Sequence, residues 1–263
     1  MRDSKLQPIG IFDSGIGGLT VVREVRKLLP RENIVYLGDT ARVPYGNKSE
    51  ETIKKFGLQD AQFLLSHNVK LIIVACNTVS SVALDYLREK IPEIPIFGVV
   101  EPGVRVAMEK SVSKKVGIIG TIATIKSEAH KRKFSSDFVV YGKPCPLFVP
   151  LAEEGIVCGT IAEEVSEMYL SEFRGKVDTL IIGCTHYPLL KGVIKKVLGD
   201  GILLVDPAEE VAREVAHFLE RENLLNESGG GLDIYLTDIP PHYIELIERF
   251  LGEKVNSVKK VEL

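Results

Sequence analysis

Three side chains that can carry protons or bind a small ligand follow one short apolar stretch of the chain. Residues 179–190 read Thr-Leu-Ile-Ile-Gly-Cys-Thr-His-Tyr-Pro-Leu-Leu, and the apolar part at 180–182 has the length of a buried strand. Cys184, Thr185 and His186 follow that strand. Ligands of parallel α/β sheets bind just past the carboxyl ends of the strands. The segment is therefore a candidate site; a core cysteine followed by helix-capping residues is the alternative interpretation.

An upstream segment repeats this arrangement. Residues 70–75 are almost wholly apolar and lead into Cys76, Asn77 and Thr78. Cys184 lies 108 residues after Cys76, so two halves of similar length each place a cysteine at the end of a comparable strand. If a two-fold axis relates the halves, both strand ends meet at one cleft. The two thiols would then lie on opposite sides of a small ligand, unless the match is a coincidence between two core cysteines.

Two opposed thiols can invert a carbon that carries an acidic hydrogen. A thiol both accepts and donates a proton near neutral pH once its surroundings shift its pKa. One sulfur would remove the α-hydrogen of an amino acid from one face, and the other would return a proton to the opposite face. Asp13, at the end of the first predicted strand, and His186 are candidate acid–base helpers. Capping of a turn or of a helix is the alternative role for each.

The carboxylate and the developing carbanion of such a substrate need hydrogen-bond donors that are placed in advance. Amides and hydroxyls near the predicted strand ends can supply them, at Ser14, Gly15, Gly46, Asn77, Thr78, Thr121, Thr124 and Thr185. The glycine-rich residues 14–18 fail the G-x-G-x-x-G fingerprint because Thr20 stands at its last glycine. These glycines therefore favour the approach of backbone amides to a small anion over the binding of a pyrophosphate.

The segments that must position these residues alternate between strand and helix patterns. Strands are predicted at residues 8–13, 33–37, 70–75, 94–100, 115–120, 138–141, 180–182, 202–205 and 232–236, with a weak one at the C-terminus. Helices are predicted at residues 20–29, 49–66, 80–90, after 102, from near Ser127, and at 160–173, 188–198, 207–224 and 241–251. Residues 145–155 are expected to be irregular, and a capping box is expected at 160–163. The alternation indicates an α/β protein with mainly parallel sheets.

The repeat predicts the domain organisation. Gly10 and Gly117 lie at matching places in two strand–turn–helix units, 107 residues apart. We expect two similar doubly wound parallel-sheet domains related by pseudo-two-fold symmetry, with the active site in the cleft between them. The first domain is assigned to residues 1–98 plus 208–263, and the second to residues 99–207.

Composition excludes several classes of partner. The 263 residues are 45% hydrophobic and 26% charged, as in a folded globular protein, and the net charge of −3 provides no basic field for nucleic acid. No apolar run approaches the roughly 20 residues that span a bilayer, and the N-terminal residues lack the apolar region of a signal peptide. We therefore expect neither a nucleic-acid nor a membrane partner.

The four cysteines lack C-x-x-C spacing; they are Cys76, Cys145, Cys158 and Cys184. This pattern favours free thiols in a reducing cytoplasm. Cys184 and His186 are too close in the chain for the usual spacing of metal ligands, so no metal is expected.

Six segments, spread in order over almost the whole chain, resemble the glutamate racemases. They are residues 8–19, 38–46, 75–78, 99–103, 120–124 and 183–188. The resemblance implies a racemase of the aspartate/glutamate type that uses neither pyridoxal phosphate nor any other cofactor. It would be an isomerase that interconverts L- and D-glutamate and supplies D-glutamate for peptidoglycan, and thereby for cell-wall biogenesis and cell shape. A cytoplasmic homodimer is the expected form.

The resemblance also implies roles for single residues. Cys76 would take the proton from D-glutamate and Cys184 from L-glutamate, and Glu153 would be a further acidic helper. The implied contacts and helpers are Asp13, Ser14, Tyr45, Gly46, Asn77, Thr78, Thr185 and His186. Relatives that act on aspartate tend to have an acidic residue in place of His186, which favours glutamate.

Alternative functions remain open at this point. A racemase of aspartate or of another acidic amino acid would share most of these residues. A cysteine hydrolase with Cys184 as nucleophile would leave Cys76 without a role. A two-lobed binding protein for small acidic metabolites would need neither thiol, and a pyridoxal-phosphate enzyme is a fourth possibility.

Overall fold

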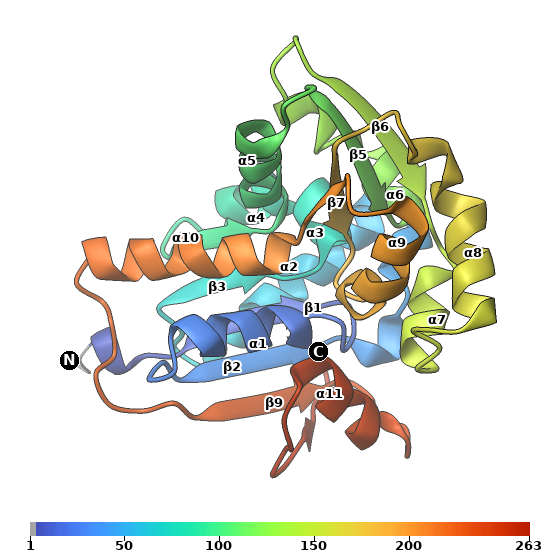
Figure 1. Cartoon of the computed structure of the whole chain (residues 1–263). Coiled ribbons are helices and arrows are strands. Elements are labelled where there is room, and N and C mark those ends of the chain that lie inside the picture. Colours follow the sequence, from blue (N-terminus) through green and yellow to red (C-terminus); the bar gives the residue numbers. More distant parts are fainter. Residues whose placement is uncertain (1–3) are drawn as a thin grey trace.

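Two parallel sheets lie side by side in the computed structural model, which describes residues 4–263 (Figure 1). The six-stranded sheet has the order β10-β9-β2-β1-β3-β4, and the four-stranded sheet has the order β6-β5-β7-β8. Strands of the first sheet are β1 (Ile9–Asp13), β2 (Ile34–Gly38), β3 (Leu71–Val74), β4 (Ile96–Gly98), β9 (Leu232–Leu236) and β10 (Lys259–Lys260). Strands of the second sheet are β5 (Lys115–Gly120), β6 (Val139–Pro144), β7 (Thr179–Gly183) and β8 (Leu203–Val205).

The two sheets share a core of four strands in the same order and in the same register. Ile9 pairs with Leu71 in the first sheet, and the residues 107 and 108 positions further along, Val116 and Thr179, pair in the second. All the pairings are parallel. This agreement confirms the predicted repeat and the predicted α/β class.

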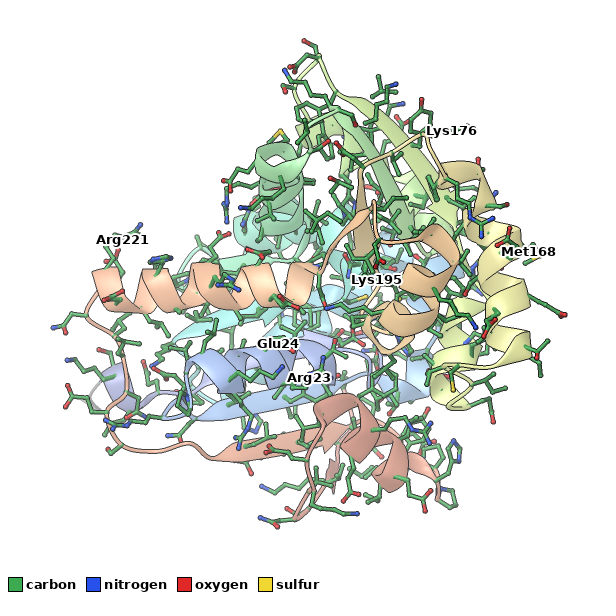
Figure 2. All side chains as sticks on the ribbon, in the orientation of Figure 1. Arg23, Glu24, Met168, Lys176, Lys195 and Arg221 are labelled. Carbon is green, nitrogen blue, oxygen red and sulfur yellow. The ribbon has the colours of Figure 1, made fainter. Side chains whose placement is uncertain are left out.

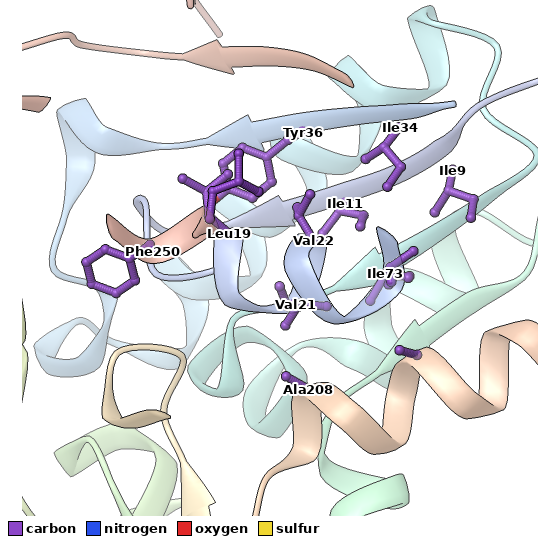
Figure 3. Packing of buried hydrophobic residues seen from close by; sticks show 14 of the residues in the cluster. Ile9, Ile11, Leu19, Val21, Val22, Ile34, Tyr36, Ile73, Ala208 and Phe250 are labelled. Atoms are coloured by element: carbon purple, nitrogen blue, oxygen red, sulfur yellow. The ribbon is translucent and has the colours of Figure 1, made fainter. Parts of the chain in front are cut away.

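Helices cover both faces of the six-stranded sheet. One face carries α1 (Leu19–Leu28), α10 (Pro207–Arg221) and α11 (Tyr243–Leu251), and the other carries α2 (Glu50–Ser66), α3 (Asn77–Val82) and α4 (Leu84–Lys90). Side chains alternate along β1, so that Ile9 and Ile11 pack under α1 while Phe12 packs on the α2 side. Figure 3 shows Ile9 and Ile11 with Leu19 and Val22 of α1 in this core.

The four-stranded sheet is covered in the same way. On one face lie α7 (Phe148–Glu153), α8 (Thr160–Leu170) and α9 (Lys191–Leu198); α5 (Val100–Lys110) covers the other, and α6 (Ile122–Lys126) follows β5. Long polar side chains such as Lys195 and Arg221 extend outward from the helices (Figure 2). In residues 4–263, no helix has both the length and the apolar character needed to cross a membrane.

Two of the predicted helix starts are confirmed together with their caps. Ser49 Oγ accepts a hydrogen bond from Thr52 N at 3.3 Å and begins α2. Asp206 Oδ1 accepts one from Ala208 N at 3.0 Å, with Pro207 as the first residue of α10. Short polar side chains at these positions satisfy backbone donors that the first turn leaves free.

The prediction of a helix from near Ser127 is wrong. Thr121 Oγ1 accepts a hydrogen bond from Thr124 N at 3.2 Å, so α6 begins earlier and ends at Lys126. The predicted helix at residues 80–90 starts instead at Asn77 and divides into α3 and α4. Residues Tyr187–Leu190 form a 3-10 turn before α9.

The predicted capping box and the predicted irregular stretch are also wrong. Gly159 is the N-cap of α8 and enters it with a φ of 83°, which glycine adopts readily, so Thr160 is already helical. Phe148–Glu153 forms α7, because Phe148 and Leu151 are buried in the core of the second half. Pro150 lies in the first turn of α7, where its missing N–H removes no helical hydrogen bond.

Candidate active site

A cavity of about 210 Å³ opens at the carboxyl ends of β1, β3, β5 and β7, where the two halves meet. Cys76 follows β3 of the first sheet, Cys184 follows β7 of the second, and both line this cavity. The other predicted site residues that line it are Ser14, Gly15, Tyr45, Gly46, Asn77, Thr78, Thr121, Glu153, Thr185 and His186. Residues 108 positions apart in the sequence thus meet at one cavity.

Asp13 lies fully buried next to the cavity and does not line it. Its Oδ2 accepts a hydrogen bond from Gly15 N at 3.1 Å, and its Oδ1 accepts one from Thr185 Oγ1 at 3.4 Å. Burial raises the pKa of this carboxyl above its usual value, although the neighbouring His186 opposes the shift. Asp13 therefore connects the first half to the loop that carries Cys184.

The surroundings of Cys76 favour its protonated form. Burial, and next the charge of Asp13, raise the pKa of the Cys76 thiol to about 12. The thiol donates to Ser14 Oγ at 3.5 Å. Cys76 is therefore a thiol at neutral pH and can donate a proton.

The surroundings of Cys184 are different, because a histidine lies beside it. His186 Nδ1 lies 3.9 Å from Cys184 Sγ, and His186 Nε2 lies 3.0 Å from Glu153 Oε1. Burial lowers the pKa of His186, but the contacts with Cys184 and Glu153 outweigh it and raise that pKa to about 10. At neutral pH an imidazolium therefore lies next to the Cys184 sulfur, and a positive charge there stabilises a thiolate.

Three threonine hydroxyls connect the halves on another wall. Thr78 Oγ1 lies 3.0 Å from Thr121 Oγ1 and 3.4 Å from Thr124 Oγ1, and the last two oxygens are 2.9 Å apart. Thr78 and Thr121 line the cavity, whereas Thr124 is buried and does not line it. Thr124 thus contacts the two lining threonines rather than the cavity.

Tyr45 lines the cavity, but its hydroxyl is engaged elsewhere. The hydroxyl donates to Asp39 Oδ2 and lies 3.2 Å from Asp60 Oδ2. Arg42 pairs with both carboxylates, at 2.5 Å from Asp39 and 3.1 Å from Asp60. Tyr45 can therefore contact a ligand through its ring or backbone, and its hydroxyl fixes the loop.

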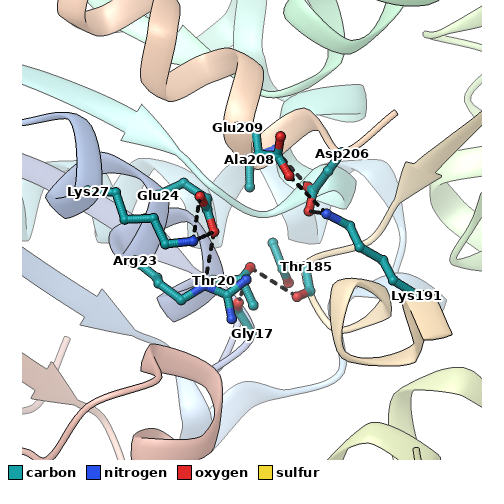
Figure 4. A network of polar contacts seen from close by, with 10 residues as sticks. All are labelled: Gly17, Thr20, Arg23, Glu24, Lys27, Thr185, Lys191, Asp206, Ala208 and Glu209. Atoms are coloured by element: carbon teal, nitrogen blue, oxygen red, sulfur yellow. Dashed lines mark hydrogen bonds and ion pairs between the residues drawn. The ribbon is translucent and has the colours of Figure 1, made fainter. Parts of the chain in front are cut away.

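Glycines allow the two halves to touch at the site. A Cβ on Gly17 would lie 2.4 Å from Thr185 Oγ1 and 2.5 Å from His186 Nδ1. Thr20, on the first turn of α1, donates to the Thr185 carbonyl at 3.1 Å (Figure 4). On the other side of the cavity, a Cβ on Gly46 would lie 2.7 Å from the Thr121 Cβ.

Lys191, the first residue of α9, links the segment that follows Cys184 to the start of α10. It lies 2.7 Å from Asp206 Oδ2 and 3.0 Å from Glu209 Oε1, so the start of α9 is tied to the start of α10 (Figure 4).

Several lining residues were missed by the sequence reasoning. They are Ile16, Val43, Pro44, Val149 and Tyr243. Val149 lies in α7, a segment without a clear periodic pattern, and Tyr243 is the first residue of the C-terminal helix. Nothing local in the sequence marks these two as site residues, because packing alone brings them to the cavity. Among residues 4–263, no group of three or more His, Cys, Asp or Glu side chains is placed to hold a metal ion.

A family model and a curated relative that match this chain both describe racemases. The family model described as Asp/Glu/Hydantoin racemase matches residues 18–215. The chain is 50% identical over 245 residues to the glutamate racemase of Aquifex pyrophilus, which covers 93% of this chain and 94% of that protein.

Solved structures agree in fold over nearly the whole length. The glutamate racemase of Francisella tularensis in complex with D-glutamate has a TM-score of 0.93 and 41% identity, with 98% of each chain covered. That of Thermus thermophilus in complex with β-chloro-D-alanine has a TM-score of 0.91 and 49% identity, also with 98% of each chain covered.

Proposed function

The chain belongs to the Asp/Glu/hydantoin racemase family, and from this premise we propose that it interconverts L-glutamate and D-glutamate by proton transfer between two cysteines. Its activity is that of a glutamate racemase, an isomerase. One structural observation supports the mechanism above all: Cys76 and Cys184, one from each half, line the same cavity.

The proposed reaction takes a proton from one face of the α-carbon and returns a proton to the opposite face. With L-glutamate bound, the Cys184 thiolate takes the α-hydrogen, and the electron pair of that bond remains on the α-carbon and its carboxylate. The Cys76 thiol then donates its proton to the opposite face, which gives D-glutamate. Cys184 ends as a thiol and Cys76 as a thiolate, and the reverse reaction restores the first state. No redox change and no cofactor enter this balance.

The neighbours of each sulfur fit these roles. The His186 imidazolium, paired with Glu153, stabilises negative charge at Cys184. Cys76 begins as the proton donor, in agreement with its raised pKa of about 12. Asp13 contacts Thr185 and raises the pKa of Cys76, so we assign it the role of helper on that side.

We assign substrate contacts to polar groups on the cavity wall. Asn77 Oδ1 is buried and accepts no hydrogen bond from the part of the chain that the structure describes, so it suits a substrate ammonium group. Hydroxyls and amides suit the two carboxylates, and we place them at Ser14, Gly46, Thr78, Thr121 and Thr185. Tyr45 and His186 complete the contacts, and Thr124 acts through Thr121.

The wider role follows from the activity and is part of the proposal. The enzyme would supply D-glutamate for peptidoglycan in the cytoplasm, acting as a homodimer.

Exchange with solvent deuterium tests the proposed function directly. Pure protein is incubated with L-glutamate in D2O, and optical rotation and α-hydrogen exchange are followed. We expect rotation to fall to zero while deuterium enters the α-position; absence of both contradicts the proposal. L-Aspartate under the same conditions should react far more slowly, and equal rates would favour a broader racemase. For alanine variants of Cys76 and Cys184, Cys158→Ala is the matched control, because Cys158 is exposed and does not line the cavity.

A further inference from the structure

The C-terminal helix α11 connects the core of the first half to the pair formed by His186 and Glu153 in the second half. Leu246, Ile247, Phe250 and Leu251 are buried, and they belong to the same core cluster as Leu19 and Val22 of α1. Figure 3 shows Phe250 at one end of this cluster. The first residue of α11, Tyr243, lines the cavity.

Phe250 packs on the imidazole of His186. The ring centroids are 5.1 Å apart and the planes make an angle of 75°, which is an edge-to-face contact. Both nitrogens of His186 already have partners, in Cys184 and Glu153. A rotation of the imidazole would break both of these contacts. The Phe250 ring, which packs against the imidazole, restricts that rotation.

Arg249 contacts the other member of the pair. Its Nη1 donates to the Glu153 carbonyl at 3.2 Å, at the last residue of α7. The guanidinium also lies over Gly155, where an added Cβ would come within 2.6 Å of Nη1. The Glu153 side chain is 39% exposed, so its direction depends on how the end of α7 is held.

We propose that α11 is a positioning element for proton transfer at Cys184, in which Phe250 orients His186 and Arg249 fixes the end of α7 that carries Glu153. Neither residue lines the cavity, so both act through the pair. Small displacements of catalytic groups reduce rates strongly, because proton transfer needs a narrow range of distances. The proposal rests on the two-cysteine function proposed above.

A test must separate the two sulfurs, and racemisation cannot do so because it uses both. Elimination of HCl from 3-chloroglutamate needs a single base: the α-proton goes to the sulfur, chloride leaves the β-carbon, and the enamine hydrolyses to 2-oxoglutarate and ammonium. Cys76→Ala and Cys184→Ala are first measured with each α-carbon enantiomer, which identifies the enantiomer served by each cysteine. If these variants do not separate the enantiomers, the two-cysteine function itself fails.

Phe250→Leu and Arg249→Ala are then measured with both enantiomers. We expect elimination to fall about tenfold for the enantiomer served by Cys184 and to stay within about twofold for the other. Phe250→Tyr and Arg249→Lys should restore most of the loss, because they keep the ring and the donor. Leu246→Ala is the matched control, because it removes core packing from the same helix.

Two results would overturn the proposal. An equal loss with both enantiomers would show that α11 only supports the fold, and unchanged rates with both would show that the pair needs no support from it. Arg249 is exposed, so its variant remains informative if Phe250→Leu does not fold.

Discussion

The two cysteines lie in different electrostatic surroundings. Cys76 is buried near the carboxyl of Asp13, and its pKa is raised to about 12. Cys184 lies 3.9 Å from the nitrogen of a histidine that is charged at neutral pH. A buried thiol beside a carboxylate holds its proton, and a cation beside a sulfur stabilises negative charge that develops there. The difference agrees with the proposal that Cys184 takes the proton of L-glutamate and Cys76 donates one.

Removal of either thiol should abolish racemisation. Cys76→Ala and Cys184→Ala each remove one of the two proton carriers that we propose, so we expect losses of at least roughly 10³-fold in kcat. The measurement is polarimetry with each enantiomer of glutamate. A variant that keeps more than a tenth of the wild-type rate would contradict the assignment of that cysteine.

His186→Asn should reduce kcat with L-glutamate by roughly 10²-fold, because it removes the cation next to Cys184. In the wild type the rate should fall as the pH rises through about 10, where the imidazolium loses its proton. The variant should lack that fall. A pH–rate profile that is the same for both proteins would contradict this role of His186.

His186 should also make stability depend on pH. Its pKa in the folded protein, about 10, lies above the ordinary value of about 6.5. The stabilisation is therefore fully present below pH about 6.5 and is lost as the pH rises through 10. Tm measured at pH 6 and at pH 10 should fall more for the wild type than for His186→Asn. Equal falls in the two proteins would argue against a charged His186 in the fold.

At the scale of elements, the loops after β1 and β2 depend on glycines that allow close contact. Gly17 precedes α1 and contacts Thr185 and His186, and Gly46 contacts Thr121. Each contact joins a loop of the first half to a strand end of the second, so the cavity depends on loops as much as on strands.

Gly17→Ala should therefore damage the site. Its Cβ would lie 2.4 Å from Thr185 Oγ1, so one side must shift, at a cost of about 1–3 kcal/mol. We expect a loss of roughly 10²-fold in kcat/KM, measured by polarimetry, together with a lower Tm. Gly192→Ala is the matched control, since no neighbouring atom of residues 4–263 lies within 4 Å of the added Cβ, and it should leave activity unchanged. Equal activity of both variants would refute the close contact.

The Arg42 cluster should determine the stability of the loop that carries Tyr45. Arg42→Met leaves the carboxyls of Asp39 and Asp60, both fully buried, without their cation, which should cost about 3–5 kcal/mol. Urea unfolding measures this cost. Lys54→Met breaks the exposed pair with Glu50 and should cost under about 1 kcal/mol. A similar small effect at Arg42 would show that the buried carboxyls do not need this cation.

At the scale of the whole molecule, two copies of one strand order meet at their carboxyl edges. The chain leaves the second sheet after β8 and returns to the first through α10, whose buried side chains pack with β1 and α1. We therefore propose residues 1–98 plus 208–263 as one domain and 99–207 as the other. Three contacts then cross the boundary and link the two domains: Lys191 with Glu209, Thr20 with Thr185, and Arg249 of α11 with Glu153.

The sequence by itself was enough to predict the class of fold, the internal repeat and the two cysteines that line the cavity. Periodic apolar runs define strands locally, and an equal offset between matched motifs needs no three-dimensional information. Helix caps such as Ser49 and Asp206 could also be predicted from the sequence, since a cap acts within the first turn of its own helix.

Only the tertiary structure decided what completes the site. It placed Val149 and Tyr243 on the cavity wall, turned the Tyr45 hydroxyl toward Asp39, and set Thr124 behind Thr121. It also formed α7 where the sequence indicated no regular element. Each of these depends on contacts between segments far apart in the chain, and such contacts leave no periodic signal in the segment itself.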